Sequence, residues 1–349
     1  MEKKKKVLFI GSTNLKHKTL LDGETIKSQY ILDILKERYY VKNVNLSHHK
    51  LFGTLKIIFF SIFRKFDYYV ISKSPQGANI ILKILRRARV NSNKIFYCLI
   101  GASLWMYFRD NDKRVKIENI KYTNAIVVET SLIKERLSDY GINNVVVLPN
   151  FKPSYDLPYV EKKYPKEILK VCFLSRLVEG KGIVELMSAI KEINVNGVKY
   201  QLDIYGVGDE DFVKKIKALT DDNIVFYGGT TVKSKDDYEH LSHYDLHCFP
   251  TKFSCEGMPG SIIDFYIAGV PTLSSRYYQH QELIDDDCAF LYEFDNDQAL
   301  KDELIYIYEH QEEITKKREE VISRAYKFTL DTFKHELFRI LEGDQNGKK

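Results

Sequence analysis

Short apolar segments alternate with amphipathic stretches through the first half of the chain. Segments rich in Val, Ile, Phe and Tyr predict strands at Val7–Ile10, Val41–Leu46, Tyr68–Ile71, Ile95–Leu99, Ala125–Val128 and Val145–Leu148. Helical spacing of apolar residues predicts helices between them, at Thr25–Glu37, Leu51–Phe63, Asn79–Arg89 and Ser131–Tyr140. Strands and helices that alternate in this way are typical of a parallel sheet covered by helices on both faces.

The same alternation starts again after a break at Pro149–Pro153. Strands are predicted at Val171–Leu174, Leu202–Tyr205, Ile224–Tyr227, Leu246–Phe249, Thr272–Leu273 and Phe290–Leu291, and helices at Ile183–Ile193, Phe212–Leu219, Tyr238–His243 and Ile262–Ala268. The pattern predicts an α/β protein of two Rossmann-like, doubly wound domains, residues 1–152 and 153–325, which face a central cleft and bind ligands at the carboxyl ends of their strands. Residues 302–341 have the spacing of two or three further helices. We expect a helix within residues 326–349 to pack back on the first domain and to end in a frayed tail.

Charge is divided unevenly between the two halves. Residues 1–155 hold 28 Lys and Arg against 12 Asp and Glu, a net charge of +16. Residues 156–349 hold 25 against 36, a net charge of −11. Such an asymmetry indicates two domains with different partners. The basic half has the charge to face nucleic acid, anionic lipid or an anionic small molecule.

Cysteine usage and apolar run lengths bear on location. The 5 cysteines include no CxxC pair and are odd in number, so we expect no disulfide framework, no structural zinc site and a reducing, cytoplasmic location. The apolar segment Val7–Ile10 is too short for the core of a signal peptide. No apolar run reaches the length of about 18 residues that a membrane-spanning helix needs.

The segment after the strand Val171–Leu174 has the residue types of a phosphate site. Arg176 and Lys181 lie five residues apart around Gly180 and Gly182, directly before a predicted helix. Glycine lets the backbone approach a ligand closely, and a helix N-terminus favours an anion. Arginine binds two phosphate oxygens at once, whereas lysine acts as a point charge. The alternative is a solvated loop with ordinary surface cations.

A second glycine-rich segment, Glu256-Gly257-Met258-Pro259-Gly260, leads into the helix predicted at Ile262–Ala268. Glu256 has the chemistry to accept hydrogen bonds from the vicinal hydroxyls of a sugar. Ser261 and Asp264 have the spacing of a capping box at the start of this helix. Asp264 is therefore a structural cap, a ligand to a bound molecule, or both, since a carboxylate has lone pairs for both roles.

Together, Arg176 with Lys181, the loop Tyr205-Gly206-Val207-Gly208, and Glu256 with an acid eight residues on resemble the C-terminal half of the retaining, GT-B-fold glycosyltransferases of family 4. This group builds bacterial surface polysaccharides. The resemblance covers residues 170–275 well and reaches the whole chain only as the alternation of strands and helices. It implies that residues 153–325 bind a UDP- or GDP-sugar donor and that residues 1–152 bind the acceptor.

The resemblance also implies roles for single residues. Arg176 and Lys181 would hold the donor diphosphate, Glu256 would contact the donor sugar, and Asp264 would bind the ribose. Most members of the family have Glu where this chain has Asp264, whose reach is one methylene shorter. The implied catalytic residues are Arg176, Lys181 and Glu256, and the implied donor-binding residues are Gly23, Gly206, Gly208, Glu256, Gly257, Met258, Pro259, Gly260 and Asp264.

The resemblance is thinner in the first half. Asp22-Gly23-Glu24-Thr25 opens the first long helix and is similar to the glycine loop that approaches the donor phosphates in this family. The His that many members place after the fourth strand has no counterpart in Cys98–Trp105, so no catalytic base is assigned. Trp105 is either a platform for an acceptor sugar or a core residue.

Four acidic DxD patterns compete with a metal-independent interpretation. They are Asp110–Asp112, Asp209–Asp211, Asp285–Asp287 and Asp295–Asp297. Four copies in acidic loops reflect composition, and the second suits a helix N-terminus electrostatically. We expect no metal and no other cofactor.

An apolar and basic surface is predicted in the first half. Leu51–Phe63 is apolar almost throughout and is bordered by Lys56, Arg64 and Lys65, while Asn79–Arg89 adds the cations Lys83, Arg86, Arg87 and Arg89. Such a surface suits the headgroup boundary of an anionic membrane. We place the acceptor or membrane side at Trp105, Arg86, Arg87 and Arg89. The alternative is a helix buried against the first sheet.

These observations predict a metal-independent, retaining hexosyltransferase. It would move a sugar from a nucleotide sugar to a lipid-linked saccharide in capsule or other cell-surface polysaccharide synthesis, in the cytoplasm and peripheral on the inner face of the membrane. One alternative is a GT-B-fold sugar-nucleotide epimerase. The other is a non-enzymatic nucleic-acid binder, for which the chain has no compact motif, so we expect no nucleic-acid partner.

Overall fold

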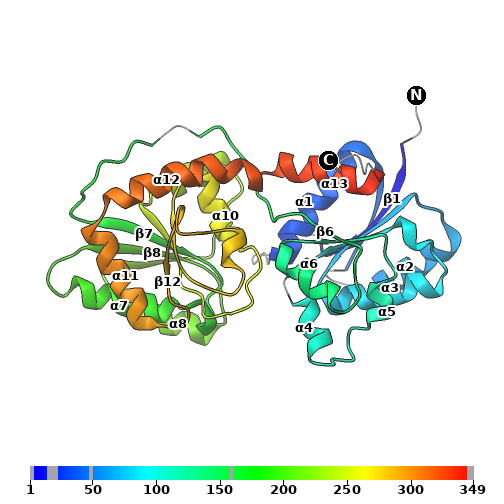
Figure 1. The fold of residues 1–349 in the computed structure, drawn as a ribbon, viewed down its shortest axis with the longest axis horizontal. Coiled ribbons are helices and arrows are strands. Elements are labelled where there is room, and N and C mark those ends of the chain that lie inside the picture. Colours follow the sequence, from blue (N-terminus) through cyan, green and yellow to red (C-terminus); the bar gives the residue numbers. More distant parts are fainter. Residues whose placement is uncertain (1–3, 14–22, 47–49, 102, 158–159, 344–349) are drawn as a thin grey trace. The chain divides into compact units, whose positions relative to one another are not determined.

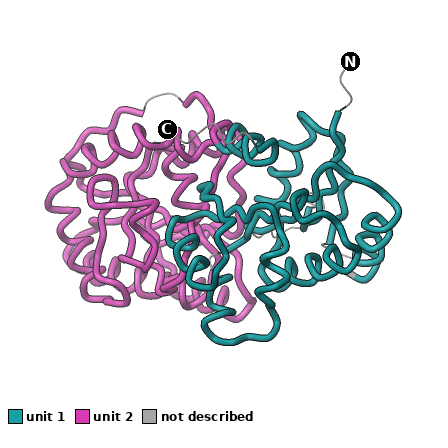
Figure 2. The backbone as a smooth tube through the Cα atoms, turned by 45° about the vertical axis from the view of Figure 1, so that its right-hand side comes forward, with its two compact units in different colours: residues 1–149, 333–349 teal, residues 150–332 magenta. Residues whose placement is uncertain are grey.

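The chain folds into two units, which Figure 2 shows in teal and magenta. The computed structural model describes residues 4–13, 23–46, 50–101, 103–157 and 160–343. Unit 1 comprises residues 1–149 and 333–349, and unit 2 comprises residues 150–332. The chain therefore crosses between units at 149/150 and again at 332/333, where the sequence predicts boundaries at 152/153 and 325/326.

Unit 1 is built on a parallel six-stranded sheet of order β2-β1-β3-β4-β5-β6 (Figure 1). The strands are β1 (Lys6–Gly11), β2 (Tyr40–Asn45), β3 (Tyr68–Lys73), β4 (Ile95–Leu99), β5 (Ala125–Val128) and β6 (Val145–Val147). The helices are α1 (Gly23–Arg38), α2 (Lys50–Phe63), α3 (Pro75–Arg87), α4 (Leu104–Arg109), α5 (Ile117–Ile120) and α6 (Ser131–Ser138), with the 3-10 turn η1 (Ser92–Lys94). Each strand predicted for the first half is present.

Unit 2 repeats this architecture with a parallel sheet of order β12-β11-β10-β7-β8-β9. The strands are β7 (Leu169–Leu174), β8 (Tyr200–Tyr205), β9 (Ile224–Gly228), β10 (Leu246–Phe249), β11 (Thr272–Ser275) and β12 (Ala289–Tyr292). The helices are α7 (Ile183–Asn194), α8 (Glu210–Ala218), α9 (Lys235–Ser242), α10 (Gly260–Ile267), α11 (Asp297–Glu309) and α12 (Glu312–Arg324), with the 3-10 turns η2 (Glu179–Lys181), η3 (His280–Glu282) and η4 (Ala325–Phe328). The predicted α/β class with two doubly wound sheets is confirmed.

The strand order places a topological switch point in each sheet. In unit 2 the chain runs from β7 outward to β8 and β9 and then returns to the other side of β7 as β10. The crevice outside the carboxyl ends of β7 and β10 is therefore where a doubly wound sheet binds its ligand. In unit 1 the equivalent place lies between β1 and β3.

The last helix, α13 (Leu330–Glu342), returns to unit 1 and packs against α1. The Tyr39 and Phe338 rings meet edge to face with centroids 5.7 Å apart, and the Tyr39 hydroxyl donates to Glu342 at 2.8 Å. Arg38 forms an ion pair with the same carboxylate at 2.8 Å. These contacts join the two segments of unit 1, residues 1–149 and 333–349.

The structure also differs from the sequence prediction in the helices of unit 1. The short helices α4 and α5 have too few turns to give a periodic apolar pattern. Helix α3 ends at Arg87, and Arg89 lies beyond it with a left-handed φ of 55°. The prediction that Arg89 belongs to this helix is therefore wrong.

Candidate functional site

Two loops meet at the carboxyl ends of β7 and β10, the switch point of unit 2. The Lys252 amide donates to the Gly180 carbonyl at 2.8 Å, which holds the loop after β10 against the loop after β7. On the other side, the Leu177 amide donates to the Val207 carbonyl at 2.8 Å. The segment that contains Arg176 and Lys181 is thus fixed between two neighbouring strand ends.

The glycines of these loops are required by contacts within the chain. Gly182 has a φ of 70°, and a Cβ there would lie 1.9 Å from the Pro250 carbonyl oxygen. A Cβ on Gly180 would lie 2.5 Å from the Phe253 ring. The sequence assigns these two glycines to the approach of a ligand, whereas the structure shows that they admit the loop after β10.

The predicted donor-binding loop at residues 205–208 has a similar internal explanation. A Cβ on Gly206 would lie 2.1 Å from the Ser175 carbonyl oxygen, and one on Gly208 would lie 2.3 Å from that of Leu177. Both glycines let this loop lie directly against the Arg176 loop. They shape the site whether or not they contact a ligand.

Lys181 and Glu256 form a largely buried ion pair at this edge of the sheet. The Lys181 ammonium contacts Glu256 Oε1, and the Thr251 hydroxyl donates to the same oxygen at 2.9 Å. The ammonium also lies 4.8 Å from the centroid of the Phe249 ring. Burial lowers the pKa of Lys181, and the nearby Glu256 carboxylate opposes this shift. The structure thus brings together a phosphate-type cation and the predicted sugar-binding acid.

Arg176 lies beside this pair with its side chain exposed. Its positive charge contributes to the lowered pKa of Lys181. Among the described residues, no hydrogen bond or ion pair occupies its guanidinium. Arg176 is therefore available to an anion that approaches from solvent.

Asp264 is not the cap predicted from its spacing. Helix α10 begins at Gly260 with Pro259 as its N-cap, and no side chain caps it. The Asp264 carboxylate is instead buried and shared by two distant partners: Lys152 reaches Oδ2 at 2.6 Å and the Tyr238 hydroxyl donates to Oδ1 at 2.8 Å. Burial raises the pKa of Asp264, and the charge of Lys152 opposes this shift. The capping-box prediction fails because long-range partners take both carboxylate oxygens.

Lys152 is a residue that sequence patterns did not reveal. Its amide donates to the Phe328 carbonyl at 2.9 Å, and its carbonyl accepts from the Leu330 amide at 2.8 Å. Its backbone thus joins the two segments that lead out of unit 2, while its side chain passes over Gly260 to Asp264. Nearby, the Asn150 side chain donates to the Met258 carbonyl at 2.9 Å and holds the buried Met258 loop.

We expect Asp264→Asn to lower the free energy of unfolding by about 3 kcal/mol, because Lys152 loses the partner of its largely buried charge. The amide keeps the size of the side chain, so the loss reports charge rather than a cavity. Chemical denaturation of the purified variant measures it. Lys152→Met added to Asp264→Asn should recover part of the loss, and an additive effect of the two substitutions would contradict the pairing.

The remaining predicted residues lie in unit 1. Gly23 is the first residue of α1, and a Cβ there would meet nothing within 4 Å, while Asp22 lies outside the described residues. Trp105 is 9% exposed, and Arg109 and Arg136 lie over its ring at 5.1 and 5.9 Å from the centroid. The structure therefore favours core packing of Trp105 over an open platform for a sugar.

The basic end of α3 remains accessible. Arg86 and Arg87 are exposed and, with Lys83, Lys116, Glu118 and Asn119, line a surface hollow of about 350 Å³. Arg86 also donates to the Asn119 side chain at 3.2 Å.

Helix α2 exposes most of its large apolar side chains. Its buried face consists of Gly53, Ile57 and Ser61, at intervals of four residues. The exposed apolar side chains are Leu51, Phe52, Leu55, Ile58, Phe59, Ile62 and Phe63. The predicted alternative, burial of this helix against the sheet, is wrong for these seven residues. In the described part of the chain, no helix has the length and apolar character to cross a membrane.

The four DxD patterns of the sequence lie in separate segments of the chain. Asp209 caps α8 by accepting from the Phe212 amide at 2.9 Å, as its sequence position indicates. Within the ranges that the structure describes, no group of three or more His, Cys, Asp and Glu side chains is arranged to hold a metal ion.

Residues 159–328 match the family model described as Glycosyl transferases group 1. These residues form almost all of unit 2 and include the whole Arg176, Lys181, Glu256 and Asp264 region. No curated protein matches the sequence.

Solved structures share the fold over nearly the whole chain. Anabaena Alr3699/HepE, solved in complex with UDP-glucose, has a TM-score of 0.74 at 14% identity, with 97% of this chain and 100% of that chain covered. A glycosyltransferase from Rickettsia africae has a TM-score of 0.68 at 14% identity, covering 99% and 100% of the two chains. The lipopolysaccharide outer core galactosyltransferase WaaB in its apo form has a TM-score of 0.67 at 17% identity, covering 97% and 99%. The predicted GT-B fold is confirmed, whereas membership of family 4 and the stereochemistry stay predictions.

Proposed function

We propose that the chain is a retaining glycosyltransferase that uses a nucleotide sugar as its donor. The observation that carries the proposal is the group of Arg176, Lys181 and Glu256 at the switch point of unit 2. Two cations and a carboxylate within one loop cluster suit a diphosphate joined to a polyol. The match of residues 159–328 to the group 1 glycosyl transferases supports the same activity.

The chemistry follows from where charge develops. As the bond between the anomeric carbon and the phosphate oxygen breaks, negative charge grows on the leaving diphosphate and positive charge on the sugar ring. Arg176 and Lys181 stabilise the diphosphate, and Glu256 holds hydroxyls of the donor sugar. The acceptor hydroxyl attacks from the face that the phosphate leaves, and its proton passes to a phosphate oxygen. The anomeric configuration is then retained.

We further propose that the reaction needs no metal, because two cationic side chains already face the diphosphate. Asp264 is proposed to add a hydrogen bond to the ribose through lone pairs that Lys152 and Tyr238 leave free. The donor is proposed to be a UDP- or GDP-hexose. Alr3699/HepE has been solved with UDP-glucose, which makes UDP-glucose the first donor to test.

The lipid-linked acceptor and the membrane location are part of the same proposal. Helix α2 places seven large apolar side chains on the surface of unit 1, and Lys56, Arg64 and Lys65 border them. Helix α3 packs beside α2 and adds Ile80, which is 55% exposed, with Lys83, Arg86 and Arg87. Apolar side chains bordered by cations complement an anionic bilayer surface. We propose that the enzyme works there on a saccharide carried by a lipid, in cell-surface polysaccharide synthesis.

Ligand-dependent stability tests the donor site. We expect UDP or GDP, and the matching hexose conjugate, to raise the free energy of unfolding by about 2.7 kcal/mol at 100 times the Kd. UDP-glucose should also be hydrolysed slowly without acceptor, and a chelator should not change this rate. If neither nucleoside diphosphate stabilises the protein, the proposed function is wrong. Release of an epimerised nucleotide sugar would instead favour the epimerase.

A further inference from the structure

Tyr277 carries a buried hydroxyl that has no hydrogen-bond partner among the described residues. The side chain is fully buried just after β11, at the same carboxyl edge of the sheet as the donor site. A buried hydroxyl without a partner costs the folded state, so native proteins rarely keep one without a reason. Because the residue lies next to the proposed site, we expect a functional reason for the unpartnered hydroxyl.

The surroundings of Tyr277 connect it with the Lys181–Glu256 pair. Its ring meets the Phe249 ring edge to face, with centroids 6.2 Å apart, and Lys181 lies 4.8 Å from the centroid of that same Phe249 ring. Next to it, the Ser275 hydroxyl donates to the Thr251 carbonyl at 2.6 Å, and the Thr251 hydroxyl donates to Glu256. Burial raises the pKa of Tyr277 well above its usual range, and the charge of Glu256 adds to this shift. The high pKa keeps the phenol protonated, as a donor. The Tyr278 amide donates to the Ser254 carbonyl at 3.2 Å, which holds the segment of Tyr277 against the loop that carries Glu256.

Two anionic groups compete for Lys181 when a donor binds, the Glu256 carboxylate and the diphosphate. In the structure its ammonium is held by Glu256, yet the proposed function assigns it to the diphosphate. When the ammonium turns toward the phosphates, its contact with Glu256 weakens. The hydrogen bond from the Thr251 hydroxyl to Glu256 remains. A largely buried carboxylate in this position needs another hydrogen-bond donor to stay in place.

We propose that Tyr277 is a positioning residue whose phenol donates a hydrogen bond to Glu256 once a diphosphate has drawn Lys181 away. In the ligand-free structure Lys181 and Thr251 both hold Glu256 through Oε1, and the phenol has no partner among the described residues. This inference rests on the proposed function. It adds a residue that keeps Glu256 oriented toward the donor sugar, and it explains why the protein tolerates an unsatisfied hydroxyl.

Tyr277→Phe in the full chain tests the inference by removing one oxygen. Because that oxygen has no partner in the ligand-free protein, the thermal midpoint should stay the same or rise. The Kd for UDP should change less than twofold, since Arg176 and Lys181 remain. The kcat/KM for UDP-glucose hydrolysis should fall at least about 10-fold, the lower end of the range expected for one hydrogen bond to a charged group. In a Glu256→Gln background, Tyr277→Phe should cause a much smaller loss, because the charged acceptor is gone.

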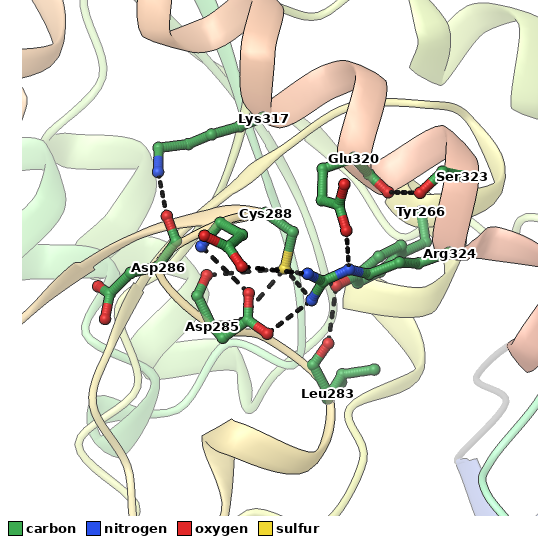
Figure 3. Close-up of polar contacts among 10 residues, drawn as sticks. Tyr266, Leu283, Asp285, Asp286, Cys288, Lys317, Glu320, Ser323 and Arg324 are labelled. Carbon is green, nitrogen blue, oxygen red and sulfur yellow. Dashed lines mark hydrogen bonds and ion pairs between the residues drawn. The ribbon is translucent and has the colours of Figure 1, made fainter.

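Tyr266→Phe is the matched control. Tyr266 is buried in α10, but its hydroxyl is satisfied, since it donates to the Leu283 carbonyl at 2.7 Å (Figure 3). Its loss should lower the thermal midpoint and leave kcat/KM unchanged.

Two results would overturn the inference in distinguishable ways. A wild-type protein that uses UDP-glucose, together with unchanged kcat/KM in Tyr277→Phe, would remove Tyr277 alone from the mechanism. The same holds if the variant loses stability as Tyr266→Phe does, because the hydroxyl then has a structural role. A wild-type protein that binds neither UDP nor GDP would overturn the proposed function and this inference with it.

Discussion

Arg176→Ala should lower kcat/KM for the nucleotide sugar about 100-fold while the free energy of unfolding stays within about 0.5 kcal/mol of wild type. The guanidinium is exposed and unoccupied among the described residues, so the folded protein loses little with it. A preorganised cation that faces the leaving diphosphate is worth about 3 kcal/mol in the transition state, which corresponds to the expected factor. Steady-state UDP-glucose hydrolysis and chemical denaturation measure the two quantities.

The control for this variant is Lys214→Ala. Lys214 is a cation of the same unit on the exposed surface of α8, where its only ion pair is an exposed one with Asp211 at 3.3 Å among the described residues. Its removal should change neither quantity. Wild-type kcat/KM in folded Arg176→Ala would exclude the guanidinium from the site.

Lys181 differs from Arg176 because it is part of the folded structure. It is buried and paired with the largely buried Glu256, so Lys181→Met should lose activity and also stability, through the carboxylate left without its cation. The Lys181–Glu256 ion pair is therefore the reason that a variant of Lys181 needs a stability control as well as an activity control. The sequence places both cations in one loop, but it does not distinguish the exposed residue from the buried one.

The most accurately predicted strands are short segments buried on both faces. β4, β5 and β10 have the predicted bounds, and burial of every residue in them explains why their pattern is so clear. The alternation of strands and helices also predicts a site at the carboxyl ends of the strands, whereas the switch point follows from the strand order in the structure. The pattern of apolar residues describes local sequence only, so it predicts the elements whose structure depends on local sequence.

The partners of the site residues were not predictable, because they come from distant positions. Asp264 has the spacing of a cap with Ser261, yet Lys152, which lies 112 residues away, takes one of its oxygens. The glycines at 180 and 182 are similar to those of a ligand loop, yet contacts with Phe253 and the Pro250 carbonyl explain them. Tyr277 gave no signal at all, since an unsatisfied hydroxyl is visible only in the packed structure.

Helix α2 is a case in which a signal was present in the sequence. A helix that is apolar all round is usually buried, and this expectation competed with membrane docking. The residues at intervals of four, Gly53, Ile57 and Ser61, include the two smallest side chains of the segment. Small residues let a helix approach a sheet closely, and the structure buries this face and exposes the large side chains.

Replacing Phe52, Phe59 and Phe63 together by Ser should weaken binding to anionic vesicles at least ~100-fold. The three rings are 64%, 48% and 67% exposed, so their loss leaves the core intact. Each ring that enters the headgroup boundary contributes about 1.5 kcal/mol or more, and three such losses correspond to more than two orders of magnitude. Co-sedimentation with phosphatidylcholine vesicles that contain 30% phosphatidylglycerol, a proportion of about one anionic lipid in three, measures the effect.

The arginines at the end of α3 are expected to contribute to vesicle binding through their charge. Replacing Arg86, Arg87 and Arg89 by Gln should weaken binding by about 1 kcal/mol for each residue that faces the bilayer, and salt should reduce the wild-type binding toward that of the variant. Val195→Ser with Tyr326→Ser removes two exposed apolar side chains from unit 2 and should have no effect. UDP-glucose hydrolysis should be the same in all of these variants, since none of the replaced residues belongs to the proposed donor site. If the triple Phe variant still binds the vesicles as the wild type does, helix α2 is not the docking surface, and a soluble acceptor becomes the better explanation of the basic unit.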